Sequence, residues 1–144
     1  MTAHAAREAT VSILDDVAAP LPAAAARKLL RALMRRLAVT ETSVAAVFGS
    51  DERLRDLNHR YRGKDVPTDV LSFPAGEGGH LGDIAISSET ARRNARAGGL
   101  TAALEARHLL IHGFLHLLDY DHETDDGEME TLERCLRREL GGRS

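Results

Sequence analysis

The chain has 144 residues, of which 43% are hydrophobic and 28% are charged, and its formal net charge at pH 7 is −3. This length predicts a single domain over residues 1–144 with a sizeable hydrophobic core. The small negative charge argues against nucleic-acid binding by bulk charge alone, and the single cysteine, Cys135, excludes an internal disulfide and a cysteine-rich zinc finger.

Alternating apolar and polar residues predict the strands, and apolar residues at helical spacing predict the helices. Prolines and glycines mark the boundaries: Pro22 lies at a helix entrance, Pro74 stops a strand and Gly98 ends a helix. The predicted elements, in chain order, are a strand at 9–15, a helix at 23–37, a strand at 42–48, a helix from Ser50 to about Arg60, strands at 68–73 and 81–87, a helix at 88–97, a histidine-rich helix that begins at Thr101, and a helix at 128–140.

This order of elements predicts an α+β fold. Two strands separated by a helix come before a hairpin-like pair of strands, and helices follow. We therefore expect a mixed four-stranded sheet packed against helices.

Location is predicted from what the sequence lacks. A membrane-spanning helix takes about 18 consecutive apolar residues, and the chain has no such run. Residues 1–8, MTAHAARE, contain no apolar signal core. With only one cysteine, these features predict a protein of the reducing cytoplasm that does not contact a membrane.

Two loops carry distinctive residues. The basic loop at 60–67 contains Arg62 and Lys64 and is closed by Gly63 and Pro67, while the glycine-rich loop at 75–80 lacks the Gly-Lys-Ser/Thr of a phosphate-binding P-loop. Arginine suits bidentate contact with phosphate. The other two basic clusters, at 27–36 and 92–96, are predicted to be solvated helix faces.

Residues 107–123, RHLLIHGFLHLLDYDHE, contain four of the seven histidines. His112, His116 and His122 follow the pattern H-x3-H-x5-H, and apolar residues surround them. Positions four apart lie on one helix face, so His112 and His116 can bind one ion, and a turn at 119–121 lets His122 supply a third nitrogen. Three imidazoles with an open fourth position are typical of a catalytic zinc site.

A single histidine on an apolar helix face is more often a core residue than a ligand. Three imidazoles in an apolar core each need a partner, however, and one metal ion satisfies all three. His108 lies about 12 Å along the helix axis from His116. We therefore expect His108 in the core or behind the ligands rather than on the ion.

The same histidine spacing occurs in the long zinc motif of metalloproteases, H-E-x-x-H-x-x-G-x-x-H, which predicts a zincin-like metal-binding helix. Residue 113, where that motif has its general-base glutamate, is glycine in this chain. A peptidase of this mechanism would lack its base, so the spacing favours another metal-dependent hydrolysis.

Several blocks of the chain resemble the YbeY family, bacterial metal-dependent endoribonucleases of ribosomal RNA maturation. Residues 112–122, HGFLHLLDYDH, resemble the family signature H-G-x-L-H-L-x-G-Y-D-H. Residues 57–65 (LNHRYRGKD) and 67–74 (PTDVLSFP) resemble its second block, and 81–84 (LGDI) resemble its third. Asp119 stands where the family usually has glycine, and a turn there favours a left-handed backbone, which aspartate tolerates at modest cost.

The resemblance implies a zinc-dependent, single-strand-specific endoribonuclease in ribosomal RNA processing. The implied roles are maturation of the 3′ end of the small-subunit RNA and ribosome quality control. The implied partners are the ribosomal RNA precursor, the small ribosomal subunit and ribosome-associated proteins. The family also has the α+β layout predicted above, and its motif marks Arg62 as an important arginine.

Phosphodiester hydrolysis needs an activated water and a cation for the developing charge. A zinc ion on His112, His116 and His122 can lower the pKa of its water toward about 7 and polarise the phosphoryl oxygen. His112 is therefore predicted to be catalytic as well as a ligand, and Arg62 is the predicted catalytic cation. The predicted substrate contacts are Arg62, Lys64 and Ser72, although an exposed arginine can also be an ordinary surface residue.

Other polar residues have two interpretations each. Thr68 and Asp69 could orient the substrate or Arg62, or they could be ordinary strand residues. Asp121 or Asp119 could accept a hydrogen bond from a metal-bound histidine, or they could be turn residues, which is the interpretation we favour for Asp119. The sequence identifies no general base, so a metal-bound hydroxide or the 2′-hydroxyl of the RNA could attack.

Two alternative functions are consistent with these residues. A ribosome-assembly factor with a mainly structural metal would lose stability without zinc and would cleave no RNA. A metallopeptidase would cleave an unstructured protein, and Gly113 argues against it.

Overall fold

The computed structural model describes residues 10–15, 17–76, 78–121 and 123–142. The elements are β1 (Thr10–Asp15), α1 (Ala23–Arg36), β2 (Ser43–Gly49), α2 (Asp51–Arg62), β3 (Val70–Pro74), β4 (His80–Ser87), α3 (Ser88–Gly98), α4 (Ala102–Leu117) and α5 (Glu128–Leu140). The sequence predicted every one of them, and their boundaries differ from the prediction by no more than two residues. Residue 9, the predicted first residue of the first strand, lies outside the described residues.

The four strands form one mixed sheet in the order β1-β2-β4-β3. The first three strands of this order run parallel, and β3 pairs antiparallel with β4. The predicted α+β fold and the hairpin-like pair are therefore confirmed. β3 is left as an edge strand of the sheet.

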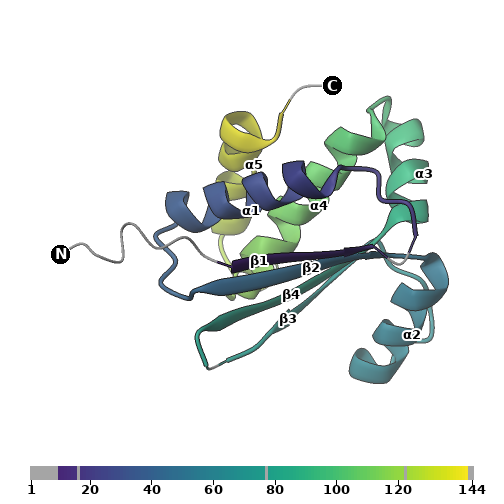
Figure 1. Cartoon of the computed structure of the whole chain (residues 1–144), viewed down its shortest axis with the longest axis horizontal. Coiled ribbons are helices and arrows are strands. Elements are labelled where there is room, and N and C mark those ends of the chain that lie inside the picture. The colour runs from purple at the N-terminus through teal and green to yellow at the C-terminus, as the bar shows by residue number, and fades with distance from the viewer. Residues whose placement is uncertain (1–9, 16, 77, 122, 143–144) are drawn as a thin grey trace.

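The helices are divided unequally between the two faces of the sheet (Figure 1). α1 and α4 cover one face, α5 packs on these two helices, α2 lies on the opposite face, and α3 packs against α4 and β4. The main core lies between the sheet and the helices α1, α4 and α5. Its fully buried members include Phe48, Ile84, Ile86, Leu110 and Phe114.

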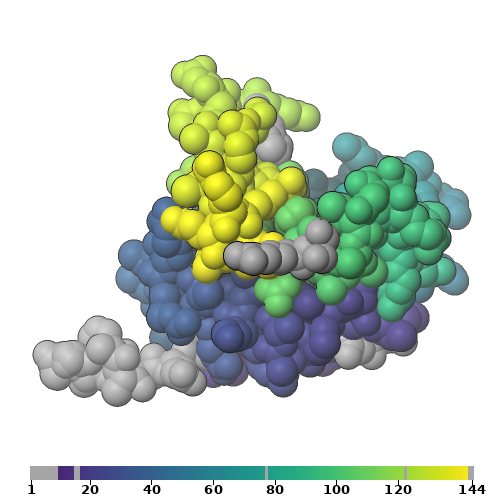
Figure 2. Space-filling view, turned by 90° about the horizontal axis from the view of Figure 1, so that it is seen from above, coloured from purple at the N-terminus to yellow at the C-terminus, as the bar shows by residue number. Residues whose placement is uncertain are grey.

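The opposite face of the sheet is only partly covered. A small core of Leu54, Leu71 and Ala85 lies between α2 and the sheet. Seen from the helical side, α5 and the segment that leads into it project at one side of the molecule (Figure 2). Within the described residues, no helix has the length and apolarity needed to cross a membrane.

The end of α2 corrects one prediction. The basic loop was expected to start at residue 60, but residues 60–62 form the last turn of α2, and Arg62 is its final residue. Gly63 ends the helix in the left-handed conformation with φ 71°, and its N–H donates to the His59 carbonyl oxygen at 3.0 Å. Gly63 therefore caps the last turn of α2. The prediction ended the helix too early because this turn has few apolar residues.

Serine and threonine side chains cap the N-termini of α2 and α4. The Ser50 hydroxyl accepts from the Arg53 N–H at 3.1 Å, as predicted for the start of α2. The Thr101 hydroxyl accepts from the Leu104 N–H at 3.1 Å, as predicted for α4.

The N-termini of α2 and α3 are joined through one carboxylate. Asp51 accepts hydrogen bonds from the Ser87 hydroxyl at 2.6 Å and the Thr90 hydroxyl at 2.5 Å, and it forms an ion pair with Arg93 at 2.8 Å. Burial alone would raise the pKa of the Asp51 carboxyl, but the hydrogen bonds from Ser87, Thr90 and Arg93 together hold that pKa below its ordinary value. The ionised form of Asp51 therefore stabilises the junction.

Candidate functional site

His112 and His116 lie one turn apart on α4 and face each other. Their Nε2 atoms are 3.1 Å apart, and the ring planes meet at 76° with centroids 4.6 Å apart. This is the convergence that the spacing of four residues predicted. His122, the third predicted ligand, lies outside the described residues.

The Nδ1 atom of each ring lies next to an acceptor that fixes how the ring is oriented. His116 Nδ1 is 3.0 Å from the Tyr120 carbonyl oxygen, which can only accept a hydrogen bond. His112 Nδ1 is 3.0 Å from Oε1 of Glu133, an acidic residue that is only 6% exposed. Each Nδ1 therefore donates its proton to a fixed acceptor, and Nε2 of each ring is directed toward the other ring.

Two nitrogens at this distance share either a proton or a metal ion, because two bare lone pairs would repel each other. Two imidazole nitrogens on one tetrahedral zinc, each about 2.1 Å from the ion, are about 3.4 Å apart. The observed separation of 3.1 Å is close to this geometry. The chemistry of the pair therefore fits a metal ion held by two Nε2 atoms, with further ligands needed to complete it.

The described part of the chain contains no third ligand for this pair. No group of three or more histidine, cysteine, aspartate or glutamate residues that could hold a metal is present among the described residues. The zinc site on His112, His116 and His122 therefore stays a prediction.

Glu133 is a site residue that the sequence analysis missed. Its second oxygen, Oε2, accepts from the Arg137 guanidinium at 2.6 Å, so the carboxylate bridges His112 and Arg137. Glu133 lies on the buried side of α5 between Met129 and Leu136. A carboxylate within the apolar stripe of a helix was the signal that could have identified it.

His108 lies on α4 one turn before His112 and is half-buried. Burial lowers the pKa of the His108 imidazole, the Arg137 guanidinium lowers it further, and the Glu133 carboxylate opposes them. The neutral form is favoured. The prediction placed this histidine in the core or behind the ligands, and it lies half-buried near Glu133 and Arg137. A cavity of about 440 Å³ opens beside His112 toward α5, and its wall includes Glu133 and Arg137.

The turn after α4 brings the backbone to His116. Asp119 is left-handed with φ 69°, as predicted for this position, and its N–H donates to the His116 carbonyl oxygen at 3.1 Å. This turn brings the Tyr120 carbonyl oxygen to His116 Nδ1. For His112 and His116 the acceptors are thus Glu133 and the Tyr120 carbonyl oxygen. The Asp121 carboxylate accepts from the Glu123 N–H at 2.9 Å.

Gly113 holds α4 against the sheet. A Cβ atom at this position would come within 2.8 Å of Ile84 Cγ2 and 3.1 Å of Val70 Cγ2. The Ser72 hydroxyl donates to the Gly113 carbonyl oxygen at 2.7 Å, which ties edge strand β3 to the turn of α4 that carries His112. A glutamate, the general base of metalloproteases, has no space at residue 113, and this argues further against the metallopeptidase alternative.

The same contact limits what Ser72 can do. The Ser72 side chain is buried, with 7% of the residue exposed, and its proton is directed to Gly113. Its predicted contact with substrate stays a prediction. The structure gives it a positioning role between β3 and α4.

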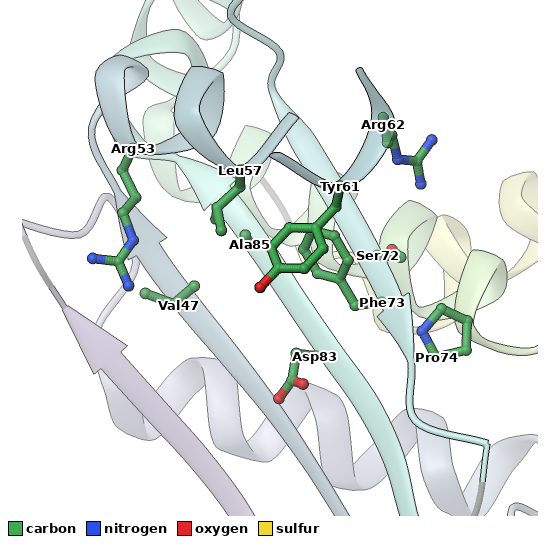
Figure 3. Close-up of a pocket in the computed structure, with 10 residues that line it drawn as sticks. All are labelled: Val47, Arg53, Leu57, Tyr61, Arg62, Ser72, Phe73, Pro74, Asp83 and Ala85. Atoms are coloured by element: carbon green, nitrogen blue, oxygen red, sulfur yellow. The ribbon is translucent and has the colours of Figure 1, made fainter. Parts of the chain in front are cut away.

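A second feature lies on the other face of the sheet. A groove of about 650 Å³ separates α2 from the uncovered part of that face, and Figure 3 shows the side chains around it. Its apolar surface comes from Val47, Leu57, Phe73 and Ala85. The remaining lining residues are Arg53, Tyr61, Arg62, Ser72, Pro74 and Asp83.

Two cations of the predicted basic loop at 60–67, Arg62 and Lys64, are available to bind a phosphate. Arg55 and Arg60 are in ion pairs with Asp65 and Asp56, at 2.8 Å and 2.9 Å respectively. Within the described residues, neither the Arg62 nor the Lys64 side chain forms a hydrogen bond or an ion pair. Both are exposed, so both can contact a phosphate.

Thr68 and Asp69 precede β3 rather than opening it. The Asp69 carboxylate accepts from the Val70 N–H at 2.8 Å, and the Asp69 carbonyl oxygen accepts from the Ser87 N–H at 2.9 Å. Asp69 therefore supports the start of β3, which is the structural of the two interpretations offered for it.

Comparison with known proteins identifies one family. The family model described as Endoribonuclease YbeY matches residues 15–141. The endoribonuclease YbeY of Koribacter versatilis is 49% identical over 106 residues, which cover 74% of this chain and 70% of that protein. The endoribonuclease YbeY of Rhodopseudomonas palustris (strain ATCC BAA-98 / CGA009) is 38% identical over 96% of this chain and 80% of its own length.

A solved structure shows the same fold. The solution structure of a protein from Thermotoga maritima is 29% identical and superposes with a TM-score of 0.65. The match covers 91% of this chain and 89% of that protein.

Proposed function

The chain belongs to the endoribonuclease YbeY family, and from this premise we propose that it is a zinc-dependent endoribonuclease that cleaves single-stranded RNA. We place its action in ribosomal RNA processing in the cytoplasm, including maturation of the 3′ end of the small-subunit RNA and ribosome quality control. Its partners in this proposal are the ribosomal RNA precursor, the small ribosomal subunit and ribosome-associated proteins.

The observation that carries the proposal is the pair of facing Nε2 atoms on His112 and His116, 3.1 Å apart. Both Nδ1 atoms donate to fixed acceptors, the arrangement that orients a histidine to bind a metal through Nε2. In the proposal His122 is the third ligand, as in the family signature. Three neutral nitrogens would leave a fourth position for water or substrate.

A zinc ion bound in such a site supplies an acidified water and polarises a phosphoryl oxygen. The protein supplies the orientation of the ligands through Glu133 and the Tyr120 carbonyl oxygen. Arg62 contributes a cation for the charge that develops on the phosphate, and Lys64 contacts a neighbouring phosphate. Ser72 and Gly113 keep β3, the strand beside Arg62, at a fixed distance from His112.

The test combines metal analysis with cleavage of single-stranded and base-paired RNA. The wild-type protein should bind one zinc and cleave the single strand, and His112→Ala should lose both properties. Arg62→Ala should keep the zinc and cleave about 100-fold more slowly, the effect of losing one group that stabilises transition-state charge. His108→Gln, on the same helix, should keep the zinc and most of the activity.

Two results would overturn the proposal. One is zinc-loaded wild-type protein that cleaves no RNA, which would favour an assembly factor with a structural metal. The other is His112→Ala protein that has lost its metal and still cleaves at the wild-type rate.

A further inference from the structure

We propose that the groove between α2 and the uncovered face of the sheet binds one unpaired base of the RNA, stacked on the ring of Tyr61. The inference rests on the proposed function, because it assigns a subsite to the same substrate. It concerns a different part of the molecule from the histidine pair, with its own residues and its own test.

Tyr61 is the exposed aromatic residue of the described part of the chain. The protein has three phenylalanines, two tyrosines and no tryptophan, and 62% of Tyr61 is exposed. Phe73 contacts the Tyr61 ring edge-on, with centroids 5.4 Å apart and planes at 63°. The ring therefore packs on Phe73 while much of its surface stays exposed beside the groove (Figure 3).

The charges around the groove divide its polar chemistry into two parts. Arg62, the next residue after Tyr61, extends away from the ring at the β3 side of the groove (Figure 3). A nucleotide whose base lies on Tyr61 would thus have a cation available for its phosphate. Ser72 lines the same side, and its hydroxyl is hydrogen-bonded to Gly113, the neighbour of His112. An RNA strand that leaves the groove on this side therefore reaches α4.

Asp83 makes the interior of the groove suit a base rather than a phosphate. Its Oδ1 lies 3.2 Å from His80 Nε2, and its side chain is still 55% exposed. A carboxylate repels phosphate but accepts from the N–H groups of base edges. It shares a face of β4 with Ala85, two residues further on, and pairs in regular register with Ala45 and Phe73. A β-bulge precedes it, with one extra residue of β4 between the positions that pair with Ser43 and Ala45. The bulge lets Leu81 and Ile84 both face the main core while Asp83 lies in the groove.

Together these features match how single strands are bound without reading sequence: an aromatic platform for a base and a cation for the backbone. An apolar floor of Val47, Leu57 and Ala85 completes the contact with the base. The groove has a volume of about 650 Å³ and opens to solvent, so it can admit a base.

The experiment measures equilibrium binding of a short, fluorescently labelled, 2′-O-methylated RNA to the full chain by anisotropy. Tyr61→Ala should weaken binding roughly 5- to 150-fold, the range for loss of one base–aromatic stack. Tyr61→Phe keeps the ring and should bind like wild type. Leu14→Ala is the matched control, because Leu14 is a 58% exposed apolar residue of β1 that does not line the groove.

A second measurement separates stacking from a general effect on the protein. The RNA is made with a single abasic sugar at each position in turn. One abasic position should weaken binding to wild type and leave binding to Tyr61→Ala unchanged, because the variant has already lost that contact. Equal loss for both proteins at every position would overturn the proposal.

The outcomes keep this subsite distinct from the proposed activity. If Tyr61→Ala binds RNA as tightly as wild type while wild type cleaves RNA, the subsite is wrong, the proposed function stands, and an apolar side chain of a protein partner becomes the better occupant. If wild type cleaves no RNA but binds it through Tyr61, the subsite stands and the proposed function is wrong.

Discussion

Glu133→Gln tests whether the buried carboxylate prepares His112 for a metal. Glutamine has nearly the shape of glutamate but offers one acceptor oxygen and one donor NH₂. If its oxygen accepts from His112 Nδ1, the NH₂ faces the Arg137 guanidinium, another donor, now 2.6 Å from Oε2. If the amide turns over, His112 Nδ1 must accept and its proton moves to Nε2, where it blocks the metal.

Either arrangement weakens metal binding. Loss of such a partner typically costs 10- to 100-fold in metal affinity, or about 1.4–2.7 kcal/mol. The assay is a competitive zinc titration against a chromophoric chelator, with urea unfolding of the metal-free protein to check that the fold persists.

Glu130→Gln is the matched control. Glu130 and Arg134 form an ion pair of the same helical spacing on α5 at 3.1 Å, but the Glu130 side chain is 70% exposed. This change should leave zinc affinity within about twofold of wild type, because exposed pairs contribute little. The reasoning is refuted if Glu133→Gln binds zinc like wild type, or if the two variants lose affinity equally.

Three further predictions concern stability and are checked by urea unfolding. Gly113→Ala should lower the free energy of unfolding by up to about 2 kcal/mol, because overpacking against Ile84 costs about 1–3 kcal/mol and better helix propensity returns about 1; a more stable variant would contradict the close approach. Asp119→Val should be about 1–2 kcal/mol less stable than Asp119→Gly, since a β-branched residue is strained at φ 69°; equal stability would show that the turn can relax. The folded-state pKa of Asp51 lies below its ordinary value of 3.8, so its stabilising effect is present above that value and is lost as pH falls through the folded pKa. Asp51→Asn should therefore be less stable than wild type at pH 7, and the difference should shrink as the pH falls below about 4; a difference that grows toward acid would reverse the assignment.

The elements of the fold could be predicted from the sequence because their signals are local. Thr101 is a cap within hydrogen-bond reach of the helix it starts, Pro74 ends a strand, and Asp119 sits where a helix must turn. The pairing of His112 with His116 is equally local, since both lie on one helix. These predictions needed no knowledge of how distant segments meet.

What could not be predicted depends on contacts between distant segments. Glu133 is 21 residues from His112, and only the packing of α5 on α4 brings them together. The groove depends on Tyr61 meeting Phe73 across two elements and on the pairing of Asp83 with Phe73 between β4 and β3. No single stretch of sequence carries that information.

The short edge strand has a consequence for association between molecules. An open sheet edge is a template for adding a strand from another chain, and long, flat edges favour aggregation. β3 has only five residues and finishes in Pro74, which has no N–H to offer. This edge of the sheet can therefore stay accessible to a polynucleotide, while it offers other protein chains few backbone groups for strand pairing.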